Sequence, residues 1–118
     1  MHTFQDNLKL KMYNYAKNVY KYTKNFPKDE LYGITSQLRR SALSVTLNYI
    51  EGYARFKPGY KLQFYENSYG SLKESKFLIF FSYGEKYLTK EEYEKSIELA
   101  EEIGKMLWSE IKLLNNKD

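Results

Sequence analysis

Between residues 93 and 114, apolar and small residues recur at alternating spacings of four and three. This is the a/d heptad pattern, which places one seam along a helix and is the packing geometry of helix bundles. A capping box starts the helix, because Thr89 can accept a first-turn N–H while Glu92 reaches back to the backbone. The seam consists of Tyr93, Ile97, Ala100, Gly104, Leu107, Ile111 and Leu114.

The same periodicity predicts three further helices and no strand. The first covers residues 6–24, and its inner face is Leu8, Met12, Tyr15, Val19 and Tyr22. The second covers residues 29–54, where Asp29 and Glu30 suit the positive N-terminal end of a helix. Its inner face is Leu31, Ile34, Leu38, Ser41 or Ala42, Val45, Asn48 or Tyr49, and Gly52. The third covers residues 58–84, with an inner face of Leu62, Tyr65, Ser68, Leu72, Ser75 and Ile79.

Short connections join the four predicted helices, so helices adjacent in sequence should run antiparallel. Pro27 and Pro58, the only prolines, fall between helical patterns, where a missing N–H is harmless. We therefore expect an all-α fold with one domain over residues 1–118, an up-down-up-down antiparallel four-helix bundle. Small residues at Ala42, Gly70-Ser71 and Gly104 are expected where helices approach closely.

Composition removes several kinds of chemistry. The chain has no cysteine, which excludes disulfides, thiolate metal sites and a cysteine nucleophile. Its one histidine, His2, adjoins the terminus, so no histidine is expected in a position to act as an acid–base catalyst. No apolar run approaches the ~20 residues of a membrane span, and no signal-peptide stretch is present. We expect a cytoplasmic protein that is not an enzyme, has no cofactor or metal, and does not associate with membranes.

Positive charge is concentrated in the N-terminal half. Residues 1–65 carry eleven Lys and Arg against four Asp and Glu, whereas residues 66–118 carry eight against eleven. Five basic residues are candidates for nucleic-acid binding: Arg39, Arg40, Arg55, Lys57 and Lys61. Basic groups neutralise phosphates, and the interleaved Phe56 and Tyr60 rings can stack on unpaired bases. The alternative is that the arginines pair with carboxylates in the bundle or in a subunit interface.

A polar stripe runs beside the apolar face of the second predicted helix. Its members are spaced three, four and three apart: Ser41, Ser44, Asn48 and Glu51. Buried polar groups need partners, so we expect a hydrogen-bonded network that fixes helix register, with a small-ligand pocket as the alternative. Glu51 can pair with Arg39, Arg40 or Arg55.

Aromatic residues make up 18% of the chain, including thirteen tyrosines and one tryptophan. One small core cannot hold so many large rings. Some must therefore lie on the surface, in loops or in a subunit interface, where tyrosine is favoured.

Several short segments carry a resemblance to a known family. They are Phe26-Pro27, Glu30, Tyr32-Gly33, Thr35-Ser36-Gln37-Leu38-Arg39-Arg40, Ser44-Val45, Asn48, Glu51-Gly52, Gly70-Ser71-Leu72, Glu74, Tyr87-Leu88 and Lys105-Met106-Leu107. In these segments the chain resembles the four-helix-bundle proteins encoded within intervening sequences of bacterial 23S rRNA genes. That family usually has a proline where Thr46 stands, Ile-Ala at Tyr49-Ile50, and Trp-Gln near Lys11-Met12. Without the proline, the second helix should be more continuous.

The resemblance implies a bacterial protein that forms a closed homo-oligomer, a pentamer with a central channel. It also implies kinship with the accessory protein of diversity-generating retroelements, a basic pentamer that engages a reverse transcriptase and RNA. The family offers no agreed catalytic or binding residues to transfer. Because that kinship agrees with the basic N-terminal half, we expect binding of structured RNA, or of an RNA–protein complex, through the basic surface. The alternative is a scaffold or accessory subunit that contacts only protein.

Overall fold

The computed structural model describes residues 3–116 and contains only helices and turns within that range. His2 and the end of the polar tail, Lys117-Asp118, lie outside the described residues. The elements are α1 (Phe4–Thr23), the short 3-10 helix η1 (Lys28–Glu30), α2 (Ile34–Tyr53), α3 (Pro58–Gly84) and α4 (Lys90–Asn115).

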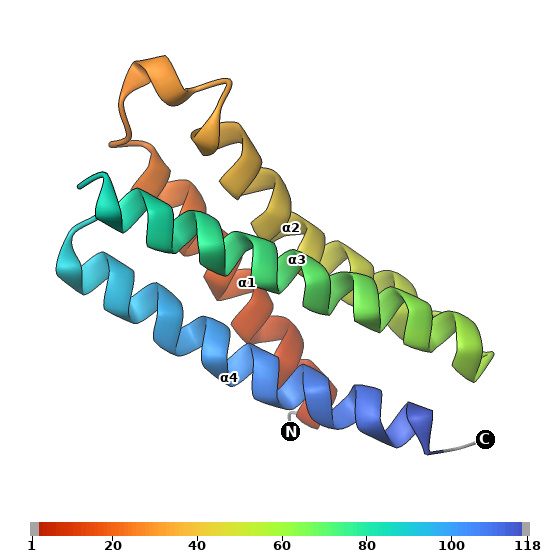
Figure 1. Cartoon of the computed structure of the whole chain (residues 1–118). Helices are drawn as coiled ribbons and strands as arrows, with labels where there is room; N and C mark the ends of the chain where they lie inside the picture. The colour runs from red at the N-terminus through yellow and green to blue at the C-terminus, as the bar shows by residue number, and fades with distance from the viewer. Residues whose placement is uncertain (1–2, 117–118) are drawn as a thin grey trace.

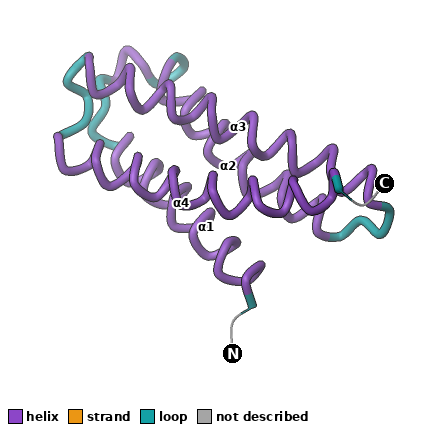
Figure 2. Tube along the Cα trace, turned by 60° about the horizontal axis from the view of Figure 1, so that its bottom comes forward, coloured by secondary structure: helices purple, strands orange, loops and turns teal. Residues whose placement is uncertain are grey.

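The four long helices form an up-down-up-down bundle (Figures 1 and 2). Each helix packs against the next one in sequence, and α4 returns to pack against α1. Contacts between helix ends show the antiparallel arrangement of α1 and α2. The Lys9 ammonium, near the start of α1, lies 4.5 Å from the ring centroid of Tyr53, at the end of α2. The predicted four-helix bundle is confirmed.

Capping boxes begin two of the helices. At α4 the Glu92 N–H donates to Thr89 Oγ1 (3.1 Å) and the Thr89 N–H donates to Glu92 Oε1 (2.9 Å), as predicted. At α1 the Asp6 N–H donates to Thr3 Oγ1 at 3.0 Å, and the Asp6 carboxylate accepts from the Thr3 N–H. This second box explains why α1 begins at Phe4, two residues before the predicted start.

The second helix begins at Ile34, so the predicted start at residue 29 is wrong. Residues 28–30 form η1 instead, and Leu31, predicted to be buried, is 48% exposed. The reason is local: the Glu30 carboxylate reaches forward along the chain and accepts the Ile34 N–H at 3.5 Å, so it caps α2 from the preceding turn. Gly33 permits this close approach, since a Cβ there would stand 2.7 Å from Glu30 Oε1. From Ile34 the helix is continuous through Thr46 to Tyr53, as expected for a chain without the proline.

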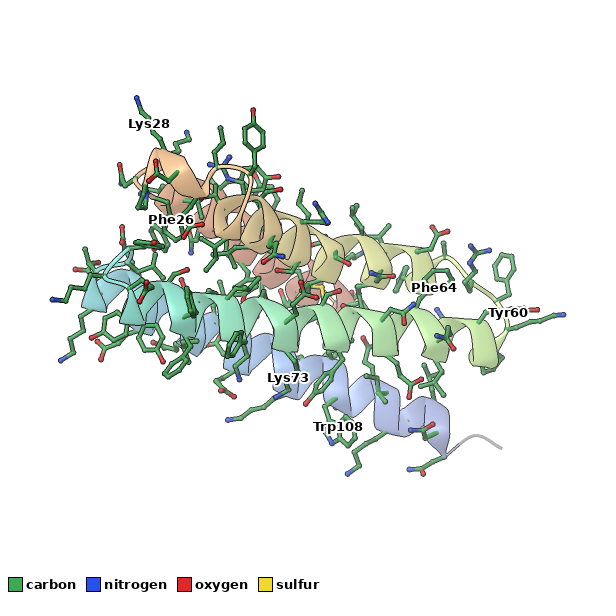
Figure 3. All side chains as sticks on the ribbon, turned by 45° about the horizontal axis from the view of Figure 1, so that its top comes forward. Phe26, Lys28, Tyr60, Phe64, Lys73 and Trp108 are labelled. Atoms are coloured by element: carbon green, nitrogen blue, oxygen red, sulfur yellow. The ribbon has the colours of Figure 1, made fainter. Side chains whose placement is uncertain are left out.

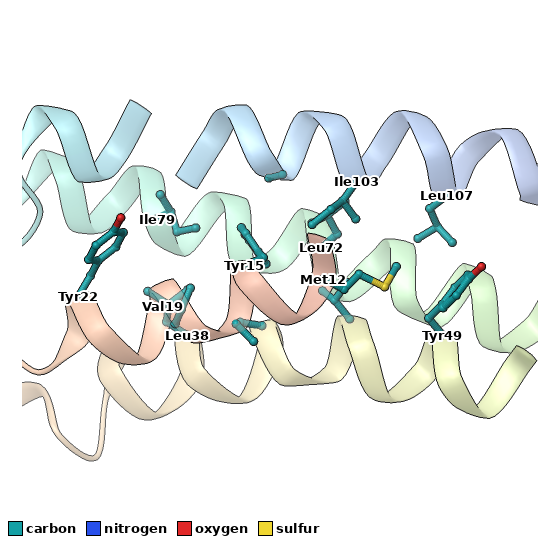
Figure 4. Close-up of a cluster of buried hydrophobic side chains, with 14 of the residues drawn as sticks. Met12, Tyr15, Val19, Tyr22, Leu38, Tyr49, Leu72, Ile79, Ile103 and Leu107 are labelled. Atoms are coloured by element: carbon teal, nitrogen blue, oxygen red, sulfur yellow. The ribbon is translucent and has the colours of Figure 1, made fainter. Parts of the chain in front are cut away.

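The core lies along the bundle axis, where the helices turn their predicted inner faces toward one another (Figure 4). All five inner residues predicted for the first helix are buried, and so are those of α3 except the half-buried Leu62. The α4 seam is buried at Ala100, Leu107 and Ile111. Its other members are half-buried, because the face is rotated toward Ser96 and Ile103.

Serine occupies every seventh position along the buried face of α3, at Ser68, Ser75 and Ser82. These hydroxyls lie between the larger buried residues Tyr65, Leu72 and Ile79. Ser68 Oγ donates to the backbone carbonyl of Val45 in α2 at 2.6 Å. A side chain as short as serine can reach another helix's backbone only when the two helices approach closely.

Glycine also contributes to the α2–α3 contact, but not at the predicted position. A Cβ on Gly52 would lie 2.8 Å from Tyr65 Cδ1 and 2.9 Å from Phe64 Cβ. Gly70 is exposed and its missing Cβ would meet nothing within 4 Å, so the prediction of close helix approach at Gly70 is wrong. Within the described residues, no helix has the length and apolar character needed to cross a bilayer.

Gly52→Ala should lower the free energy of unfolding by about 1–3 kcal/mol, because the added methyl overpacks the contact with α3. Gly70→Ala is the matched control and should raise stability by up to about 1 kcal/mol through helix propensity. Urea unfolding followed by circular dichroism measures both. Equal effects of the two substitutions would contradict a tight contact at Gly52.

Candidate nucleic-acid interface

Arg39 packs within the bundle, where it contacts α1. The side chain is half-buried, and its Nε donates to Thr23 Oγ1 in α1 at 2.8 Å. The guanidinium also lies 5.0 Å from the ring centroid of Tyr20. Arg39 therefore fastens the start of α2 to the end of α1, using a hydroxyl and a ring rather than a carboxylate.

Arg40, the next residue, leaves the helix on the exposed side. It lines a shallow groove on the outer face of α2, together with the apolar Leu43, Leu47 and Ile50. Adjacent residues on a helix point about 100° apart, which is why this pair of arginines has two different environments.

The other three candidates meet at the turn between α2 and α3. Arg55 pairs with Glu51 through Nη2 and Oε1 at 2.7 Å, and its guanidinium lies 5.1 Å from the Phe64 ring centroid. Arg39, Arg40 and Arg55 were the predicted partners of Glu51, and the structure shows the ion pair with Arg55. The Lys57 ammonium lies 5.9 Å from the ring centroid of Tyr60.

Lys61 closes the end of α2. Its Nζ donates to the backbone carbonyls of Gly52 (3.1 Å) and Tyr53 (3.0 Å) in the last turn of α2, where the Gly52 carbonyl also accepts the Arg55 N–H at 3.0 Å. A cation at this position also complements the negative end of the helix dipole. Partial burial lowers the pKa of Lys61, and the nearby Glu110 carboxylate opposes that shift. Lys61 thus has a structural role beside any contact with a polyanion.

Two rings at this turn face solvent. Phe56 is 99% exposed and Tyr60 is 60% exposed. We call Arg55, Phe56, Lys57 and Tyr60 the aromatic–basic tip; Figure 3 shows Tyr60 at the extreme end of the bundle. Arg39 is sixteen residues before Arg55 in nearly continuous helix, so about 24 Å of helix rise separates them. The five basic candidates are therefore not one surface.

The polar stripe forms a smaller network than predicted. Asn48 Nδ2 donates to Ser44 Oγ (2.8 Å) and to the Ser44 carbonyl (2.9 Å). Ser71 Oγ of α3 donates to Ser44 Oγ at 2.8 Å, which links the two helices. Ser41 donates only to the Leu38 carbonyl of its own helix, and Glu51 pairs with Arg55, so neither shares these hydrogen bonds. The structure thus joins Ser44 and Asn48 of the predicted stripe to Ser71, a partner that the sequence did not identify.

A second polar cluster, which the sequence did not reveal, lies toward the end of the bundle that holds the α2–α3 turn. The Tyr49 hydroxyl donates to Glu110 Oε1, and Gln5 Nε2 donates to Glu110 Oε2 at 3.0 Å. The Tyr49 and Tyr65 rings are stacked with centroids 4.7 Å apart. Glu110 lies seven residues after the buried Ile103 and so shares its side of α4, a spacing that none of the exposed glutamates earlier in the helix has.

Burial changes the titration of the core tyrosines. It raises the pKa of Tyr65 from 10.0 to about 12, with a smaller contribution from the Glu110 carboxylate. Burial also raises the pKa values of Tyr15 and Tyr49. In each case the folded chain holds the phenol proton more tightly than the unfolded chain does.

Stability should therefore be fully present below pH 10 and fall as the pH rises from 10 toward 12, because the unfolded chain loses these protons first. Urea unfolding at a series of alkaline pH values measures the slope. Tyr65→Phe removes one titrating group and should make the slope shallower. A slope unchanged by Tyr65→Phe would show that Tyr65 titrates alike in the folded and unfolded chains.

Among residues 3–116, the His, Cys, Asp and Glu side chains form no group of three or more that could hold a metal ion. The candidate surfaces on the described chain are built from lysine, arginine and aromatic rings. Such groups bind anions and stack on planar ligands.

Comparisons with known proteins agree with this fold. A family model described as 23S rRNA-intervening sequence protein matches residues 7–109. The chain is also similar to the crystal structure of a protein of unknown function from the S23 ribosomal protein family of Bacteroides thetaiotaomicron VPI-5482. The TM-score is 0.84 at 22% identity, over 93% of this chain and 99% of that chain. At this identity the likeness shows the fold alone. The search of curated proteins found no match.

Proposed function

The chain belongs to the 23S rRNA-intervening sequence protein family, and from this premise we propose a non-enzymatic, cytoplasmic RNA-binding protein. The proposed contact is the aromatic–basic tip, which would hold unpaired nucleotides of a structured RNA. The observation that carries the proposal is Phe56, a phenylalanine 99% exposed between Arg55 and Lys57. Of the five basic candidates, the two that flank this ring are assigned to the contact.

The physical argument concerns the cost of exposing an apolar ring. Phe56 gains nothing from burial in this chain, so a ligand that covers it recovers the full benefit of removing the ring from water. Stacking of a base on an aromatic side chain contributes about 1–3 kcal/mol, and adjacent cations neutralise the phosphates on either side. A single-stranded loop offers both groups, whereas a duplex hides its base faces.

Phe56→Ala should weaken binding of a short fluorescein-labelled oligouridylate by about 1–3 kcal/mol, measured by fluorescence anisotropy. Arg55→Gln with Lys57→Gln should reduce the slope of log affinity against log salt by about 0.7 for each phosphate that is no longer neutralised. The fold should not change, because these side chains are exposed.

The matched control is Tyr32→Ala. Tyr32 is also an exposed aromatic residue, at 93%, but it precedes α2 and so lies at the other end of that helix. Tyr32→Ala should bind oligouridylate as the unsubstituted chain does. Equal losses of affinity from the Phe56 and Tyr32 substitutions would place the contact elsewhere, and no binding by the unsubstituted chain would reject the proposal.

The outer face of α2 favours a second candidate function, assembly of copies of this chain into a closed homo-oligomer such as a pentamer. Leu43, Leu47 and Ile50 are spaced four and three apart, which puts them on one side of the helix, and all three are exposed. They line a groove of about 590 Å³ that Arg40 and Glu51 flank. Apolar residues rimmed by charges are typical of protein interfaces. The same face would serve the alternative of a protein-only scaffold.

Leu47→Glu should reduce the mass measured by light scattering from that of the oligomer to that of one chain, because it places a charge in the apolar stripe. Leu47 is 61% exposed, so the substitution should leave the fold intact. Leu113→Glu, on an α4 leucine that is 64% exposed, is the matched control and should keep the oligomer. An unsubstituted chain with the mass of a monomer would overturn the assembly proposal.

A further inference from the structure

A small pocket lies between α3 and α4, away from both surfaces described above. Its volume is about 160 Å³. Charged and aromatic side chains surround it: Tyr69, Lys73 and Lys76 from α3, and Glu101, Lys105 and Trp108 from α4. Figure 3 shows Lys73 and Trp108 on the same side of these two helices.

Three lysines and one glutamate line this pocket. Lys76 Nζ pairs with Glu101 Oε1 at 2.6 Å. The Lys76 ammonium, with smaller contributions from Lys73 and Lys105, holds the pKa of Glu101 below its usual value. One of the three positive charges is thus neutralised, and the pocket keeps an excess of two.

The rings form a wall beside these charges. The Tyr69 and Trp108 ring centroids are 5.8 Å apart, and Trp108 is 49% exposed. The Lys73 ammonium lies 5.2 Å from the Tyr69 ring centroid, so cation and ring occupy the same side of the pocket. Gly104 and Leu72 also line the pocket, and a Cβ on Gly104 would stand 3.5 Å from Leu72 Cδ2.

We propose that this pocket binds a nucleoside monophosphate group, with the phosphate on Lys73 and Lys105 and the base against Trp108. A phosphate monoester carries about 1.5–2 negative charges near pH 7, which matches the excess of two, whereas a carboxylate carries one. Pockets that enclose a whole drug-sized ligand measure about 300–1,000 Å³. This smaller pocket suits the phosphate and sugar, and leaves the base at the rim, where the half-exposed indole offers its face.

Trp108 is the only tryptophan in the chain, so its fluorescence reports on this pocket directly. Titration with adenosine 5′-monophosphate at low ionic strength should quench the emission to saturation. Adenosine, which lacks the phosphate, should need at least about tenfold higher concentration, because it cannot form the charge-assisted hydrogen bonds. Inorganic phosphate should compete with the nucleotide.

Lys73→Gln combined with Lys105→Gln should weaken the nucleotide at least about tenfold, as expected when two charge-assisted hydrogen bonds are removed. Lys95→Gln is the matched control, because Lys95 is another exposed lysine of α4 that does not line the pocket. Circular dichroism confirms that each variant is folded. Phe56→Ala should leave the titration unchanged, which separates this pocket from the aromatic–basic tip.

The ligand has two potential sources, a free nucleotide or the 5′-phosphorylated end of an RNA strand. An oligoadenylate with a 5′-phosphate that binds at least about tenfold tighter than its 5′-hydroxyl form and than the mononucleotide supports the RNA end. Equal affinity of the mononucleotide and the phosphorylated strand supports the free nucleotide. The proposal is overturned if millimolar nucleotide produces no saturable quenching, or if the double lysine variant binds as tightly as Lys95→Gln.

Discussion

The close approach of α2 and α3 is the constraint on which the rest of the structure depends. It requires small groups on both helices: Ser68 is short enough to donate to the Val45 carbonyl, and Gly52 leaves room for the Tyr65 ring. This contact brings the end of α2 beside the start of α3, where Lys61 caps the last α2 carbonyls. The turn between the helices is consequently tight, and its own side chains have no core to enter.

The same use of small residues explains why so many rings are exposed. Serine takes alternate inner positions along α3, so Tyr65 is the one ring on its buried face, and Phe77, Phe80 and Phe81 all lie on the outside. The prediction that some aromatic residues must be on the surface is confirmed. Rings beside lysines recur at the α2–α3 turn and at the α3–α4 pocket, so the surface repeatedly offers groups that suit planar anions.

Much of the fold could be predicted because its signals are local. Heptad spacing and a capping box depend on residues three or four apart, so the inner face of α1 and the start of α4 agree with expectation. The predicted start of α2 was wrong because the Glu30 carboxylate caps the helix from the preceding turn, a contact that helix periodicity does not report. The prediction of close packing at Gly70 was wrong because a small residue marks such packing only when it faces another helix. The residue types in Gly70-Ser71 do not specify which side of the helix Gly70 occupies.

The sequence by itself determined the class of fold, the number of long helices, most of their buried faces and the kinds of chemistry that residue content excludes. Only the tertiary structure decided the partners of the functional candidates. In the folded chain Arg39 contacts Thr23 and Tyr20, Arg55 pairs with Glu51, and Glu110 accepts a hydrogen bond from Tyr49. The physical reason is that spacing fixes which side of a helix a residue occupies. The axial register and rotation of the neighbouring helix, set by packing of all four together, decide what that side meets.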